Sequence, residues 1–370
     1  MKKNSVKTML LGWLLLLLGQ PSPLFSDYTM MCTFFSNPEA RVFKVSDEGA
    51  ITFDYNINVG GYPTSLEFSP NGRWGLISGD TTEGHPERQI ATILKVDEDR
   101  TISVLGYVYN EHENLVAISP DSEYGVYGRD LKTLRFHSDN TYEVIPEEND
   151  PLVCPDVAFS KLSGNMMGLN GWIYGEMCEF SLLPDGRAAP TGFSVDINPS
   201  RGNRGLKVSP DGRTCIVISS ADYRITSLRI NELGGFSIAQ QFNSVSANAK
   251  DIGFTPDSRY VFISFIDPED GNIRSYAINP DSTLTLVQAL SLGNDCGEDM
   301  AVTPDGKFAI TRHLMLSSGA RSFFNVVRIN NDGTMEYLPE NDYNCLGFVS
   351  DIEFVPPIIT SSRDLWMNYE

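Results

Sequence analysis

The stretch GLKVSPDGRTCIVISSADYRITSLRIN (residues 205–231) contains the unit from which most of the chain is built. Leu206 and Val208 alternate with polar neighbours, as in a half-buried strand. Pro210-Asp211-Gly212 supplies turn chemistry, because proline fixes φ, aspartate bonds its own backbone and glycine tolerates a positive φ. A short apolar run at 215–218, a polar loop and a further alternating segment follow. The stretch therefore predicts three strands, the first two joined by a tight turn.

Two motifs repeat along the chain with the same period. The first is the turn just described, and its copies lie 41 to 52 residues apart, at Pro70, Pro120, Lys161, Pro210, Pro256, Pro304 and Pro356. The second is an alternating strand end followed by an acidic or Asn/Gly turn. Its copies lie 40 to 51 residues apart and begin at Phe43, Leu94, Leu134, Phe180, Leu228, Tyr276 and Val327. Seven copies of each motif indicate seven structural repeats.

A period in the forties with four short strands per repeat is typical of a β-propeller. We assign the first motif to the turn between the two inner strands of a blade, and the second to the turn between the two outer strands. The sequence therefore predicts an all-β fold, a seven-bladed β-propeller over residues 27–357. A β-sandwich with the same strand content would not produce a common period.

The order of the motifs predicts how the ring closes. An outer hairpin at 41–54 precedes the first inner strand, and the last inner strand, 351–355, has no outer hairpin after it. We therefore expect one shared blade, in which the C-terminal segment gives the innermost strand and residues 28–57 give the other three. This closure removes free sheet edges that would invite aggregation. Residues 358–370 are expected to form a tail outside the repeat.

The first 26 residues have the pattern of a secretory signal peptide. Lys2, Lys3 and Lys7 precede a ten-residue apolar run, and Ser26 is suited to cleavage. The run is shorter than the roughly 20 residues that a transmembrane helix needs. The alternative is an uncleaved N-terminal anchor. We expect a periplasmic or secreted monomer with no membrane contact beyond the signal peptide. The net charge of −20 also argues against a nucleic-acid partner.

The six cysteines suggest different roles. Cys32 and Cys215 are assigned the same strand position in different blades, so we expect them to be buried, separate and free. Cys154 with Cys178, and Cys296 with Cys345, are candidate disulfide pairs, although sequence does not fix the connectivity. No spacing typical of a zinc or haem site is present.

The segments that lead into the innermost strands are expected to surround the central tunnel, where loops on a rigid scaffold carry function. Aspartate recurs at the start of four predicted inner strands, and the candidate ligand-binding residues are Asp156, Arg204, Asp251, Glu298, Asp299 and Asp351. A ring of carboxylates would suit Ca²⁺, at Asp156, Asp251, Asp299 and Asp351, or a polyhydroxy ligand. The alternative, which we favour, is that each aspartate accepts a backbone N–H bond and ties adjacent blades together. No other cofactor is expected.

Candidates for catalysis are few. His112 lies in a predicted tunnel-facing loop, where it could act as a base. The other three histidines are at positions 85, 137 and 313, and we expect His137, in an outer turn, to be solvated. No Ser-His-Asp order, G-x-S-x-G elbow or phosphate-binding glycine loop is present.

The repeats resemble those of the seven-bladed lactonase family, which includes bacterial 6-phosphogluconolactonase-like proteins, and of the related YVTN-type surface propellers. The segments that carry this resemblance are LKVSPDGR (206–213), MAVTPDGK (300–307), FKVSDEGAITF (43–53) and VRINNDGTMEY (327–337). Members of the lactonase family carry Arg, often an Arg-His pair, where a middle inner strand begins. The resemblance implies a catalytic role for Arg204, while Gly205 stands where the histidine would be.

Two functions are consistent with this sequence. The first is a non-enzymatic exported propeller that binds a small molecule or protein through its tunnel face, because no complete catalytic set is recognised. The alternative is a lactonase-like hydrolase acting on a sugar lactone, with Arg204 and His112 as candidate catalytic residues. It would need an arginine and a general base close to a water molecule at the tunnel mouth.

Overall fold

The structure is a computed structural model. It describes residues 27–35, 37–81, 89–110, 115–146, 154, 156–170, 175–197, 203–219, 223–244, 248–266, 272–293, 297–315, 321–345 and 347–358. The predicted signal peptide and nearly all of the predicted tail lie outside these residues. No helix in the described part of the chain is long and apolar enough to cross a membrane.

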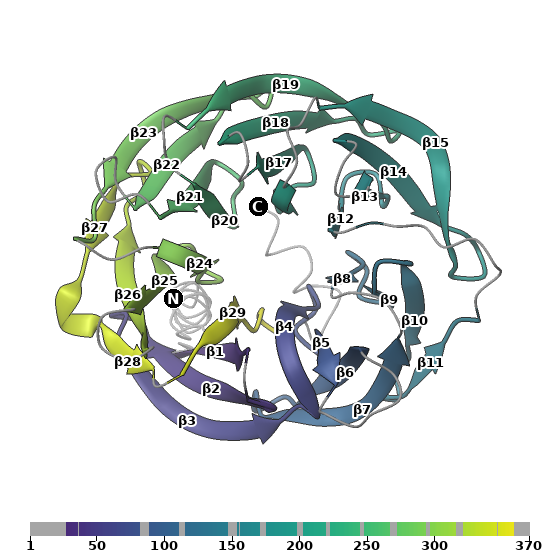
Figure 1. Cartoon of the computed structure of the whole chain (residues 1–370), viewed down its shortest axis with the longest axis horizontal. Helices are drawn as coiled ribbons and strands as arrows, with labels where there is room; N and C mark the ends of the chain where they lie inside the picture. The colour runs from purple at the N-terminus through teal and green to yellow at the C-terminus, as the bar shows by residue number, and fades with distance from the viewer. Residues whose placement is uncertain are drawn as a thin grey trace, which may run out of the picture.

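Seven antiparallel sheets form a ring, and each blade is named here after its innermost strand (Figure 1). The β4 blade contains β4 (Gly61–Phe68), β5 (Trp74–Thr81), β6 (Gln89–Val96) and β7 (Ile102–Asn110). The β8 blade contains β8 (Val116–Ile118), β9 (Tyr124–Tyr127), β10 (Lys132–Phe136) and β11 (Tyr142–Val144). The β12 blade contains β12 (Val157–Phe159), β13 (Met166–Asn170), β14 (Glu176–Leu182) and β15 (Ala188–Asp196).

The next three blades continue the same order. The β16 blade contains β16 (Asn203–Val208), β17 (Thr214–Ser219), β18 (Arg224–Ile230) and β19 (Phe236–Asn243). The β20 blade contains β20 (Ala249–Phe254), β21 (Tyr260–Phe265), β22 (Ile273–Ile278) and β23 (Leu284–Leu290). The β24 blade contains β24 (Gly297–Val302), β25 (Phe308–Met315), β26 (Arg321–Ile329) and β27 (Met335–Tyr337). A 3₁₀ turn, η1 (Pro339–Asn341), and a fifth strand, β28 (Tyr343–Cys345), which pairs with β26, complete it.

The last blade closes the ring as predicted. Its innermost strand is β29 (Val349–Phe354), and the other three are β1 (Asp27–Phe34), β2 (Glu39–Ser46) and β3 (Ile51–Asn58). Met30 pairs with Phe354 and Cys32 with Ile352, so the two ends of the described chain share one ladder. Figure 1 shows β29 and β1 side by side at the inner edge of this blade.

The hydrophobic core is divided among the boundaries between blades. The buried apolar side chains of the described residues form seven clusters, each joining two neighbouring blades. β1 shows why inner strands are apolar on both faces. Met30 and Cys32 pack toward the β24 blade, whereas Met31 packs toward the β4 blade. Alternating side chains of one strand therefore serve two boundaries.

The first motif forms the turn between the two inner strands, as predicted. In the β16 blade, Asp211 Oδ1 accepts hydrogen bonds from Ser209 Oγ (2.6 Å) and from the Arg213 backbone N–H (3.1 Å). Gly212 has φ +76°, and a Cβ there would lie 2.3 Å from the backbone nitrogen of Leu162. The glycine is therefore needed for both its conformation and its contact with the neighbouring blade.

The cysteine assignments are partly wrong. Cys32 and Cys215 are both buried, as predicted. They do not share a strand position, because Cys32 lies opposite Ile352, next to Asp351, whereas Cys215 lies opposite Val208, three residues after Gly205. Nor is Cys32 separate, because its thiol contacts that of Cys345. Cys296 lies outside the described residues.

Candidate functional site

Three of the predicted ring aspartates hold neighbouring blades together. Each accepts a backbone N–H bond from the residue that follows it and another from the next blade. Asp156 binds Val157 at 2.9 Å and Leu206 at 2.7 Å. Asp251 binds Ile252 at 2.7 Å and Met300 at 2.8 Å. The third aspartate repeats this arrangement at the shared blade.

Asp351 accepts bonds from Ile352 at 2.8 Å and Leu66 at 2.7 Å, and so joins the closing blade to the β4 blade. Both carboxylate oxygens of the three aspartates are thus used inside the scaffold. Among the described residues, no group of three or more His, Cys, Asp or Glu side chains is arranged to hold a metal ion. The blade-tying interpretation accounts for these contacts, and Ca²⁺ binding stays a prediction without structural support.

Asp299 occupies the same repeat position but has a different partner. It lies with Glu298 in a bulge of β24, between the pairs Gly297–His313 and Met300–Thr311, directly opposite Arg312. Arg312 Nε is 2.6 Å from Asp299 Oδ2, and its Nη2 forms an ion pair with Glu298. The Arg312 side chain is 7% exposed, against 21% for Glu298 and 24% for Asp299. The cluster therefore consists of a buried cation flanked by two more accessible carboxylates.

Arg312 is a departure from the repeat. The strand pairing places Thr33, Ser78, Ile218 and Ser264 at its position in four other blades. At this position Ser264 Oγ accepts a hydrogen bond from the Asp251 backbone N–H, whereas Arg312 forms ion pairs with two carboxylates. An alignment of the second strands of the blades could have identified this residue. Glu298 and Asp299 were predicted because they lie in an inner strand, and their partner was missed because it lies in a second strand.

A second charged group lies further along the tunnel. Lys207 Nζ is 3.1 Å from Asp251 Oδ1, and the lysine side chain is 41% exposed. Desolvation lowers the pKa of Lys207, but the carboxylates of Asp251, Glu353 and Asp351 outweigh it and raise the pKa above its ordinary value. This lysine therefore stays protonated and offsets part of the negative charge in the tunnel.

Several carboxyl groups around Lys207 and Arg312 bind protons more tightly than usual. Desolvation raises the pKa of Asp299 to about 8, against the opposing effect of Arg312. Desolvation also raises the pKa of Glu67 to about 8, and those of Asp156, Asp351 and Glu353 to about 7. Groups that titrate near neutral pH can exchange protons with a substrate, a property common at functional sites.

The structure does not describe the side chains of the two predicted catalytic residues. Arg204 lies in β16 at a bulge in its pairing with β17, and its side chain is outside the described residues. His112 is also outside them. His137 is solvated as expected, 3.8 Å from Glu143. His313 follows Arg312, but it is 5% exposed and its Nδ1 contacts Asn325 Oδ1 at 2.6 Å, away from the carboxylates.

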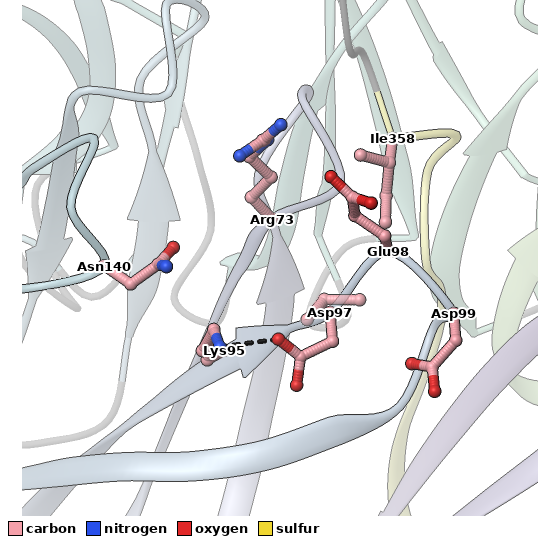
Figure 2. A pocket seen from close by; sticks show the side chains of 8 residues that line it. Arg73, Lys95, Asp97, Glu98, Asp99, Asn140 and Ile358 are labelled. Atoms are coloured by element: carbon pink, nitrogen blue, oxygen red, sulfur yellow. Dashed lines mark ion pairs between the residues drawn. The ribbon is translucent and has the colours of Figure 1, made fainter.

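A separate hollow of about 520 Å³ lies at the other end of the strands (Figure 2). Its wall includes Arg73, from the turn between β4 and β5, and Lys95, Asp97 and Glu98, from the end of β6 and the turn after it. Lys95 and Asp97 form an ion pair with each other on this wall, at 2.5 Å. With Asp99, the wall carries three carboxylates and two cations, so the hollow has a slight preference for a cation.

Comparison with known proteins is consistent with this architecture. The sequence model of the family described as "Lactonase, 7-bladed beta-propeller" matches residues 180–319, a segment that includes Glu298, Asp299 and Arg312. No curated protein sequence matches the chain significantly.

Solved structures of the same fold include sugar lactonases. A proposed 6-phosphogluconolactonase from Bacteroides uniformis is 18% identical, with a TM-score of 0.70, and the match covers 89% of this chain and 100% of that one. A periplasmic gluconolactonase from Pseudomonas aeruginosa is 16% identical, also with a TM-score of 0.70, and the match covers 89% and 99%. At these identities the likeness shows the fold alone. The predicted resemblance is confirmed: the chain is a seven-bladed β-propeller, and residues 180–319 are similar to the lactonase family.

Proposed function

We propose that this protein is a lactonase-like hydrolase that acts on a sugar lactone at the tunnel face. The observation that carries the proposal is the cluster of Glu298, Arg312 and Asp299, in which a buried guanidinium is held between two partly exposed carboxylates. It combines an acid–base group with a positive charge at one point of the ring, within the segment that matches the lactonase family.

Lactone hydrolysis has two chemical requirements that this cluster can meet. A water molecule must lose a proton as it attacks the ring carbonyl carbon, and negative charge then develops on the carbonyl oxygen. Glu298 is suited to accept the proton, and the guanidinium of Arg312 to stabilise the oxyanion. Asp299, with a pKa of about 8, exists in both forms near neutral pH and is suited to protonate the departing ring oxygen.

The cellular location is also a proposal. The basic start and apolar run of residues 1–26 support export, as does the fold shared with a periplasmic gluconolactonase. An exported lactonase would meet sugar lactones outside the cytoplasm.

A second candidate function is binding without turnover through the same tunnel face. It is favoured by the use of Asp156, Asp251 and Asp351 as links between blades, which leaves a rigid acidic mouth. Such a mouth suits a polyhydroxy or cationic ligand, because carboxylates accept hydrogen bonds and attract positive charge.

Turnover separates the two candidates. The hydrolase proposal predicts that purified protein accelerates hydrolysis of glucono-1,5-lactone above the spontaneous rate, measured as acid release at constant pH near 7. Calorimetry with a stable neutral polyol, glucitol, would report binding in parallel. Hydrolysis no faster than in buffer, across neutral and phosphorylated sugar lactones, would refute the hydrolase. Glucitol binding with no turnover would support the second candidate.

A further inference from the structure

Cys32 and Cys345 meet at the seam where the ring closes. Cys32 lies in β1, the strand that pairs with β29, and Cys345 lies in β28, at the start of the segment that leads into β29. The Cys32 thiol is hydrogen-bonded to the Cys345 sulfur. Both side chains are fully buried, in one cluster with Phe43, Phe324 and Val349. The two sulfurs are therefore held together by packing from both blades.

A positive charge lies beside this pair. Arg41 is opposite Cys32 in the β1–β2 ladder, and its Nη1 is 3.7 Å from the Cys345 sulfur. The hydrogen bond from Cys32 and the charge of Arg41 lower the pKa of Cys345, whereas desolvation raises that of Cys32. The folded seam thus places a cation beside the Cys345 sulfur, while the Cys32 thiol stays protonated.

We propose that Cys32 and Cys345 form a disulfide bond that locks the closed ring covalently. The ladder between β29 and β1 is otherwise held by hydrogen bonds and packing alone. A bond between Cys32 and Cys345 would tie the N-terminal strands of the shared blade to the segment that supplies its innermost strand. This role concerns the scaffold and does not depend on the proposed lactonase activity.

The oxidant required is a small disulfide, such as oxidised glutathione. The Cys345 thiolate attacks one sulfur of the oxidant, forms a mixed disulfide and releases one thiolate. The Cys32 thiol then loses its proton and attacks the Cys345 sulfur, and the second thiolate leaves. Two protein thiols are oxidised, one disulfide is reduced to two thiols, and the two thiol protons go to the departing groups. Because both sulfurs are buried, we place this exchange before the seam closes during folding, in the oxidising compartment to which export would bring the chain.

Peptide mapping tests the proposal directly. The mature chain is refolded with oxidised and reduced glutathione, alkylated without reduction, digested and analysed by mass spectrometry. We expect a peptide pair linked through Cys32 and Cys345. In the folded protein this bond should resist dithiothreitol, and it should become reducible when the protein is unfolded. Recovery of Cys32 and Cys345 as alkylated thiols, or linked to other cysteines, would overturn the proposal.

Thermal unfolding gives an independent measurement. Oxidised protein is expected to have a Tm at least about 5 °C above that of reduced protein, because the bond closes a loop of more than 300 residues. Cys345→Ser should abolish this difference, whereas Cys215→Ser, which removes a buried cysteine at a different blade boundary, should keep it. A redox-dependent Tm that persists in Cys345→Ser would contradict the assignment. Mapping of the wild-type chain remains decisive if either variant fails to fold.

Discussion

Both carboxylate oxygens accept hydrogen bonds from backbone N–H groups in Asp156, Asp251 and Asp351. Asp299 instead contacts a guanidinium. The difference lies in the facing residue. Asp251 faces Ser264 and Asp351 faces Thr33, and both aspartates reach the next blade, whereas Asp299 faces Arg312 and pairs with that cation. Aspartate at this repeat position therefore links neighbouring blades in three cases, and in the fourth it forms part of the candidate catalytic cluster.

Asp351→Ala is expected to lower the free energy of unfolding by about 2–4 kcal/mol, because it leaves the buried N–H groups of Leu66 and Ile352 without their charged acceptor. Asp351→Asn keeps one acceptor oxygen, so its free energy of unfolding should lie between those of the wild type and Asp351→Ala. Denaturant titration measures the change. Asp332→Ala, in an exposed outer turn, serves as the control and should have a much smaller effect. Equal effects of the two alanine substitutions would contradict the blade-tying role.

Glu67→Gln tests the raised pKa in the tunnel. The Glu67 carboxylate accepts a bond from Ile118 at 3.1 Å, and folding raises its pKa from 4.5 to about 8. A pKa raised by folding means that the folded state binds the proton more tightly, so this stability is present at low pH and is lost as the pH rises from about 4.5 to about 8. Glutamine keeps the acceptor oxygen and does not ionise.

Wild-type protein should therefore lose stability relative to Glu67→Gln as the pH rises from about 5 to about 8, by at most about 1.4 kcal/mol per pH unit. Denaturant titrations of both proteins across this range measure the difference. A difference that does not change with pH would show that Glu67 has an ordinary pKa.

At the scale of elements, the turns between the inner strands form contacts from blade to blade. Ser160 Oγ donates to the carbonyl of Gly212 at 2.9 Å, and the Asp211 backbone N–H donates to Ser258 Oγ at 2.9 Å. These turns recur in the sequence because each one packs against its neighbour in the ring. Their recurrence makes the repeat period detectable in the sequence. The lone copy without proline, at Lys161, still makes the contact.

Gly212→Ala is expected to be more destabilising than Gly164→Ala. Both glycines have positive φ, +76° and +73°, so both alanines carry a backbone strain of about 1–2 kcal/mol. At Gly212 the new Cβ would also meet the Leu162 backbone, whereas at Gly164 nothing lies within 4 Å. The clash should add a further 1–3 kcal/mol, roughly, in a denaturant titration. Similar losses at the two sites would show that the turns do not pack tightly.

At the scale of the whole molecule, the fold was predictable and the candidate site only in part. Seven copies of two turns fix the number of blades, and their order fixes the shared blade, because both depend on local sequence. The Glu298–Arg312–Asp299 cluster depends on the register between two paired strands, and no local sequence motif singles out Arg312. Likewise, Cys32 and Cys345 are far apart in sequence and meet through ring closure alone.

The net charge of −20 bears on the substrate of the proposed hydrolase. Carboxylates at Asp251, Asp351 and Glu353 surround Lys207 in the tunnel. A phosphate group on the lactone would be repelled by this field, so kcat/KM should be roughly tenfold higher for glucono-1,5-lactone than for its 6-phosphate, about 1.4 kcal/mol. The gap should narrow at high salt, which screens the repulsion. A preference for the phosphorylated lactone would show that the tunnel mouth does not repel a phosphate group.

The most direct test of the proposed active site compares two arginine variants. Arg312→Gln removes the buried guanidinium between Glu298 and Asp299, and Arg259→Gln removes an arginine that is 60% exposed in the β20–β21 turn, at the far end of the inner strands. With folding checked by circular dichroism, we predict that kcat/KM for glucono-1,5-lactone falls at least about 100-fold in Arg312→Gln and is unchanged in Arg259→Gln. Wild-type activity in folded Arg312→Gln would contradict the assignment of this cluster as the catalytic site.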